Sequence, residues 1–148
     1  MEISTEELYE QFLSIKNSSF DLATKSRILT VMLSSKKGSW KVVGITKQAL
    51  EEFKKNNFKY TKGLNRSHIV QRKSTHDKMM STDFNSHNEW WRFHIENDKT
   101  IISMSLENKN VLHCEIFEVP EELDLFENKI ISWNHSSKEV EFLKKLAA

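Results

Sequence analysis

Capping-box motifs at separate places along the chain indicate where helices begin. In this motif a serine side chain accepts a hydrogen bond from the backbone three residues on, and a glutamate at that position bonds back. The motifs are Ser4 with Glu7, Ser86 with Glu89, and Ser136 with Glu139. Each precedes apolar residues at helical spacing, which predicts helices at the start, in the later middle and at the end of the chain.

The segments between these motifs predict a mixture of helices and strands. Further helices are expected over 21–35, from Thr46 through Phe53, and over 75–81; strands are expected over 40–45, 58–72 and 129–133. Two apolar segments, 100–106 and 111–119, are joined by Glu-Asn-Lys-Asn, which is typical of an antiparallel hairpin. We therefore expect an α+β fold, with N-terminal helices followed by a mostly antiparallel sheet and a C-terminal helix.

Length and composition favour one domain that folds without disulfides. A chain of 148 residues suits a single domain, which we expect to be mainly helical over 1–57 and sheet-containing over 58–148. Cys114 has no second cysteine to pair with, and its apolar neighbours predict that it is buried. The N-terminus lacks the features of a signal peptide and no apolar run reaches membrane-spanning length, so we expect a cytoplasmic protein without membrane contact.

Charge is unevenly distributed along the chain. Residues 54–78 contain many lysines and arginines and a single acidic residue, Asp77, whereas 115–127 contain acidic residues and no basic one. A concentrated positive charge attracts a polyanion, which predicts a nucleic acid as the partner. The alternative is that the two regions pair with each other in the fold.

The basic stretch also contains a group of residues suited to phosphodiester chemistry. If 58–72 is a strand, Arg66, His68 and Arg72 lie on one face, because side chains alternate along a strand. A histidine can transfer a proton near neutral pH, and arginines can hold a phosphate while charge develops on it. Lys62 and Lys73 are then expected to hold the flanking phosphates.

A second stretch, 85–94, contains aromatic residues and histidines. On a helix Trp90 and Trp91 point to different faces, so one is expected in the core while Trp91 could stack on a base. His87 and His94 are about 10 Å apart along such a helix, too far to share one metal ion without other ligands.

The order of three residues resembles the HNH, or ββα-metal, nucleases. These have a histidine at the end of a strand, an asparagine further on, and a metal-binding histidine on a following helix; His68, Asn85 and His94 follow that order. The resemblance covers about 30 residues, and Ser67 stands where the family often has an acidic metal ligand. It implies a divalent metal such as Mg²⁺, held in part by Asn85 and His94.

These patterns lead to two functional hypotheses. The first is a nuclease of restriction or toxin type that hydrolyses DNA or RNA. The second is a non-catalytic module that binds nucleic acid or protein, such as a regulator or a phage-encoded inhibitor. Glycine-rich phosphate loops are absent from the sequence, which argues against the common nucleotide-cofactor enzymes.

Overall fold

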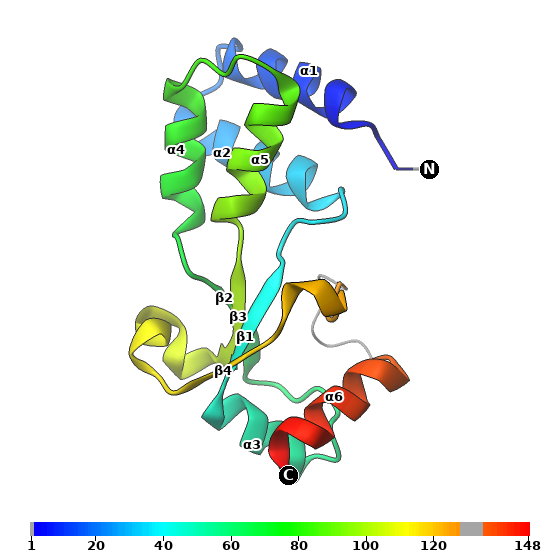
Figure 1. Ribbon diagram of the computed structural model, residues 1–148. Coiled ribbons are helices and arrows are strands. Elements are labelled where there is room, and N and C mark those ends of the chain that lie inside the picture. The colour runs from blue at the N-terminus through cyan, green and yellow to red at the C-terminus, as the bar shows by residue number, and fades with distance from the viewer. Residues whose placement is uncertain (1, 128–134) are drawn as a thin grey trace. The chain divides into compact units, whose positions relative to one another are not determined.

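The computed structural model describes residues 2–127 and 135–148, and its chain forms two compact units (Figure 1). Unit 1 comprises Met1–Ser39 and Val70–Asp98, and unit 2 comprises Trp40–Ile69 and Lys99–Ala148. The two units therefore do not divide at residue 57, where the sequence analysis separated a helical part from a sheet-containing part. Whether the chain behaves as one domain stays a prediction.

Unit 1 consists of helices. These are α1 (Thr5–Lys16), α2 (Leu22–Ser34), α4 (Arg72–Ser81) and α5 (His87–Asn97). Their apolar sides enclose a buried core made of Leu8, Phe12, Leu29, Leu33, Met79 and Trp90. Contacts of α1 with α2 and α5, and of α4 with α2 and α5, hold the helices together around this core.

Unit 2 is built on a mixed sheet of β1 (Val42–Thr46), β2 (Leu64–His68), β3 (Thr100–Met104) and β4 (Ile116–Glu118). The order across the sheet is β2-β3-β1-β4, so β2 lies at one edge. β1 runs parallel to β3, and the other two pairings are antiparallel. The expected α+β class with a C-terminal helix is confirmed.

Helices α3 (Lys47–Lys55) and α6 (Ser137–Ala147) pack together and against the sheet. Buried residues from both helices join those of the strands in one core, among them Ala49, Leu50, Phe53, Leu64, Ile102 and Leu143. Two 3-10 segments, η1 (Ser105–His113) and η2 (Glu121–Leu123), connect the later strands.

The capping serines expected from the sequence are confirmed, and the full capping box is formed at Ser136, whose amide donates to Glu139, whereas Glu89 accepts from the Asn85 amide instead of that of Ser86. The side chains of Ser4, Ser86 and Ser136 each accept a hydrogen bond from the backbone three residues on, at 3.1 to 3.2 Å. Asp21 and Thr46 cap α2 and α3 in the same way. These bonds are local in sequence, which is why the sequence alone could predict them.

The hairpin expected over 100–119 is wrong. β3 and β4 both pair with β1 rather than with each other, and η1 replaces the first part of the expected second strand. Glu107, in the expected turn, is buried: its carboxylate accepts hydrogen bonds from the Thr46 hydroxyl at 2.6 Å and the Met104 amide at 2.9 Å. The turn is thereby held to a residue 61 positions earlier.

Other expectations over the same regions also need correction. Cys114 is half-buried rather than buried, because it ends η1 instead of lying in the middle of a strand. The extended segment is confined to β2, and the following helix begins at Arg72 rather than at Thr75. The strand expected over 129–133 lies outside the described residues.

Candidate functional site

Strand β2 places Arg66 and His68 on the same face of the sheet. Leu64, Arg66 and His68 alternate with Asn65 and Ser67, and Leu64 belongs to the buried core beneath α3 and α6. Ser67 instead bonds to Ser103 at 2.6 Å on the opposite face. Two of the three expected catalytic residues thus share one strand face of unit 2.

Arg72 does not lie on that face, which corrects the expected group of three. It is the first residue of α4 and belongs to unit 1, since the strand ends at His68. Lys73 follows it on the same helix and is exposed. Gln71 precedes α4 without a side-chain capping bond, so the sequence carries no capping signal for the start of this helix.

The guanidinium of Arg66 is buried in unit 2. Its Nε and Nη1 atoms have no hydrogen-bond partner within residues 2–127 and 135–148. Burial lowers the pKa of Arg66 to about 10, an effect that the carboxylate of Glu139 opposes. The side chain is therefore a cation at neutral pH, and two of its donors are unsatisfied in the described structure.

His135, immediately before α6, lies in the same electrostatic environment. Its side chain is 6% exposed, and its Nδ1 is 3.9 Å from Oε1 of Glu139. Its ring meets those of Phe53 and Phe126 edge-on, with centroid distances of 5.2 and 5.3 Å. Burial lowers the pKa of His135, an effect that Glu139 opposes and Arg66 reinforces, so the imidazole is neutral at neutral pH.

The Nε2 atom of His135 has no hydrogen-bond partner within the described part of the chain. His135 is not among the site residues expected from the sequence. The signal that could have found it is its position: His135 directly precedes the capping box of α6 and lies four residues before Glu139.

Glu139 is held in place by the backbone. Oε1 accepts a hydrogen bond from the Ser136 amide at 2.8 Å, and Oε2 accepts one from the Phe126 amide. The side chain is buried, so its negative charge acts on Arg66 and His135 with little screening by water. Arg66, His135 and Glu139 form what we call the buried charge cluster of unit 2.

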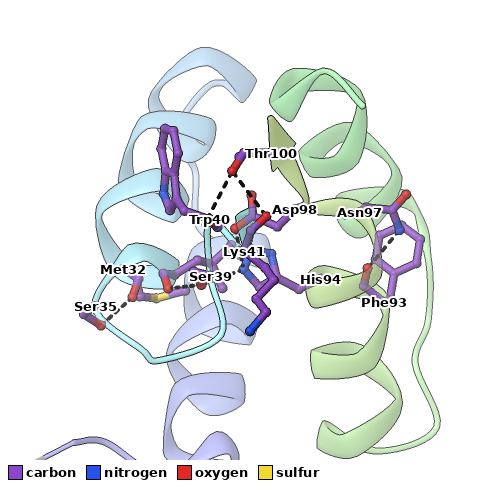
Figure 2. Close-up of polar contacts among 11 residues, drawn as sticks. Met32, Ser35, Ser39, Trp40, Lys41, Phe93, His94, Asn97, Asp98 and Thr100 are labelled. Carbon is purple, nitrogen blue, oxygen red and sulfur yellow. Dashed lines mark hydrogen bonds and ion pairs between the residues drawn. The ribbon is translucent and has the colours of Figure 1, made fainter. Parts of the chain in front are cut away.

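His68 is half-buried and packs against an aromatic ring. Its ring centroid is 4.4 Å from that of Trp40, which it meets edge-on. Trp40 has a positive φ of 60°, and its carbonyl accepts a hydrogen bond from the Thr100 hydroxyl at 3.2 Å (Figure 2). Backbone conformation and hydrogen bonding thus hold the backbone of the residue whose ring contacts His68.

Lysines from the last turn of α3 to the start of β2 make no ion pair with any described residue. These are Lys54, Lys55, Lys59 and Lys62, all exposed, and we call them the lysine surface. The last turn of α6 reaches the same region, because Nζ of Lys144 lies 5.9 Å from the ring centroid of Phe58.

Within residues 2–127 and 135–148, the acidic run from Glu115 to Glu127 makes no ion pair with the lysine surface. Three of its carboxylates pair with lysines elsewhere in unit 2: Lys41 with Asp124 at 3.2 Å, Lys99 with Glu121 at 3.5 Å, and Lys47 with Glu115 at 3.8 Å. In these pairs, lysines outside 54–78 provide the positive charge that the acidic run contacts.

The other expected site residues lie in unit 1. His94 is 2% exposed, and its Nε2 is 2.9 Å from the Ser39 hydroxyl and 3.5 Å from Asp98 (Figure 2). Asn85 lies before the N-cap of α5, where its amide donates to Glu89 at 3.1 Å, whereas His94 lies in the second half of the helix. Within the described residues, no three or more His, Cys, Asp or Glu side chains are grouped to hold a metal ion.

Of the two neighbouring tryptophans, one lies in the core, as expected, and the other is partly exposed. Trp90 is fully buried, whereas Trp91 is half-buried. The ring of Trp91 lies 5.8 Å from Nζ of Lys36 and 5.0 Å from the ring of His94. Contacts with Lys36 and His94 within unit 1 therefore account for part of the burial of the Trp91 side chain.

Comparison of the chain with models of protein families, with curated proteins and with solved structures found no match. Among the described residues, no helix combines the length and apolar character that crossing a membrane requires. Function must therefore be argued from the side chains themselves.

Proposed function

We propose that the protein binds nucleic acid through the lysine surface of unit 2. The observation that carries this proposal is the concentration of exposed lysines over 54–62 without carboxylate partners in the described structure. Lys54 and Lys55 also stabilise the C-terminal end of α3 through the helix dipole. Lys59 and Lys62 lie beyond the helix, so that effect does not explain them.

The proposal is tested by reversing charge beyond the helix. We expect Lys59→Glu with Lys62→Glu to weaken binding to all nucleic-acid sequences alike, because phosphate contacts carry no sequence information. The slope of log affinity against log salt should fall by about 2, which is about 1 for each lost phosphate contact. The measurement is fluorescence anisotropy of labelled DNA and RNA oligonucleotides, single- and double-stranded, across a salt series.

A matched control is available in unit 1. Lys78→Glu with Arg92→Glu makes the same change in net charge at exposed positions of α4 and α5. This control should bind as the parent does. Equal weakening by both variants would show that binding follows total charge and not the lysine surface, and a parent that binds no oligonucleotide at low salt would refute the proposal.

Cleavage of the bound nucleic acid is a second candidate function. It is favoured by the shared strand face of Arg66 and His68, which offers a phosphate-binding cation beside a proton-transfer group. Labelled DNA and RNA are incubated with Mg²⁺ and, separately, with EDTA. We expect the parent to cleave in at least one of these conditions, and His68→Ala to lose that cleavage while it keeps binding. Binding without cleavage under every condition would leave the non-catalytic module.

A further inference from the structure

The buried charge cluster contains more hydrogen-bond donors and acceptors than its described neighbours satisfy. Nε and Nη1 of Arg66 and Nε2 of His135 are all buried without a partner within residues 2–127 and 135–148. Native proteins pair the great majority of their buried polar atoms, and an unpaired buried cation is especially unfavourable. Three such atoms in one cluster point to a group that enters from outside the chain.

Glu139 compensates the charge of Arg66 without satisfying its donors. Both carboxylate oxygens are engaged by backbone amides, those of Ser136 and Phe126. No ion pair joins Arg66 to Glu139 in the described structure, although the carboxylate still raises the pKa of the guanidinium. The missing partner must therefore be an acceptor, and an oxyanion provides acceptors with a matching charge.

A surface hollow of about 440 Å³ borders the cluster at His135. It is lined by His135, Ser137, Val140, Glu141 and Lys144. Lys144 also lies over Phe58, close in sequence to Lys59 of the lysine surface. The hollow is thus bordered by a cation that would attract an anion, with Glu141 as the opposing charge.

We propose that Arg66 and His135 form a receptor for one phosphate group. It is either the terminal phosphate of a nucleic acid held on the lysine surface, which rests on the proposed function, or free inorganic phosphate. Arg66 donates through Nε and Nη1, and His135 donates through Nε2. Phe53 and Phe126 border the imidazole and exclude water, which strengthens these hydrogen bonds.

The test compares ligands with and without the phosphate group. The probes are inorganic phosphate, followed by calorimetry, and one oligonucleotide prepared with a 5′-phosphate, a 3′-phosphate or no terminal phosphate. We expect the parent to bind inorganic phosphate, and to bind one phosphorylated form about tenfold more tightly than the unphosphorylated form, the scale of one charge-assisted hydrogen bond. Binding of inorganic phosphate without a terminal-phosphate preference would assign the receptor to the free ion.

Arg66→Met should abolish both the binding of inorganic phosphate and the preference for the phosphorylated oligonucleotide. His135→Gln is a second variant that should weaken phosphate binding in the same direction. Arg92→Met, at an exposed arginine of α5, is the matched control and should behave as the parent does.

The outcomes separate this proposal from the proposed function. Binding of the oligonucleotides without any preference, together with no binding of inorganic phosphate, overturns the receptor and leaves the lysine surface intact. Binding of inorganic phosphate without any oligonucleotide binding supports the receptor and overturns nucleic-acid binding on the lysine surface. Unchanged phosphate affinity in folded Arg66→Met and His135→Gln variants also overturns the receptor.

Discussion

Replacing Glu139 by glutamine is expected to lower the free energy of unfolding of unit 2 by about 3 kcal/mol, the upper end of the usual cost of leaving a buried hydrogen-bonding group unsatisfied. The carboxylate accepts from the amides of Ser136 and Phe126, and glutamine offers only one oxygen for the two. The backbone amide of Ser136 or of Phe126 would then face the side-chain NH₂ group of the glutamine, which cannot accept its hydrogen bond. The guanidinium of Arg66 would also lose the negative charge that compensates it.

This result is measured by thermal or denaturant unfolding followed by circular dichroism. A loss of about 3 kcal/mol corresponds to a fall in melting temperature of roughly 6–12 °C for a chain of this size. Glu141→Gln is the control: it makes the same change on the same helix at an exposed position and should stay within about 0.5 kcal/mol of the parent. Equal effects of the two substitutions would contradict the role given to Glu139.

A double variant separates the two parts of the loss. In an Arg66→Met background there is no buried cation for Glu139 to compensate, so Glu139→Gln should cost less there than in the parent. Arg66→Met alone should leave stability unchanged or raise it, because it removes a buried cation whose donors are unsatisfied, while Glu139 keeps its two backbone amide bonds. A strongly destabilised Arg66→Met variant would indicate a structural role for the arginine.

Trp90→Ala is expected to destabilise unit 1 by about 3–5 kcal/mol, the usual cost of removing a large buried aromatic side chain. Trp90 is 0% exposed, and its ring lies 5.1 Å from that of Phe12 and 5.3 Å from that of Tyr9. Its Nε1 is buried without a partner in the described structure. Trp90→Phe should therefore cost much less, because it removes the unsatisfied N–H while it keeps an aromatic ring.

Denaturant unfolding compares these two substitutions with Phe20→Ala. Phe20 is 52% exposed, so its removal should change stability by no more than about 0.5 kcal/mol. If Trp90→Phe proves as costly as Trp90→Ala, the indole N–H has a partner and the core is held differently. A Trp90→Ala variant as stable as the parent would contradict the core assignment.

The parts of the fold that the sequence predicted are those set by local bonds. The caps at Ser4, Ser86 and Ser136 each join residues three positions apart, so their pattern is visible in the sequence. The hairpin failed because strand pairing is set by distant residues. Glu107 bonds to Thr46, which is far from it in the chain. β3 and β4 both pair with β1, which precedes them by more than 50 residues.

The candidate site followed the same rule. Alternation along β2 correctly placed Arg66 and His68 on one face, because that relation is local. The approach of His135 and Glu139 to Arg66 depends on where α6 packs, about 70 positions later in the chain. Arg72 was placed in the strand because the short stretch after His68 has no pattern that distinguishes a strand from a helix. Tertiary contacts decide between the two, and Arg72 begins α4.

The pairing of β2 with β3 has a consequence for how the chain could be rebuilt. His68 pairs with Thr100, and the Ile69 amide bonds to the Lys99 carbonyl at 3.1 Å, so unit 2 closes its own ladder where residues 70–98 leave and return. Those residues thus form an insertion between two hydrogen-bonded strand ends. A short turn could replace the insertion without altering the register of the sheet, provided that residues 1–39 are exchanged with it, because α1 and α2 share their buried core with α4 and α5. Natural or engineered variants could then exchange unit 1 as a whole while the phosphate chemistry proposed for unit 2 stays in place.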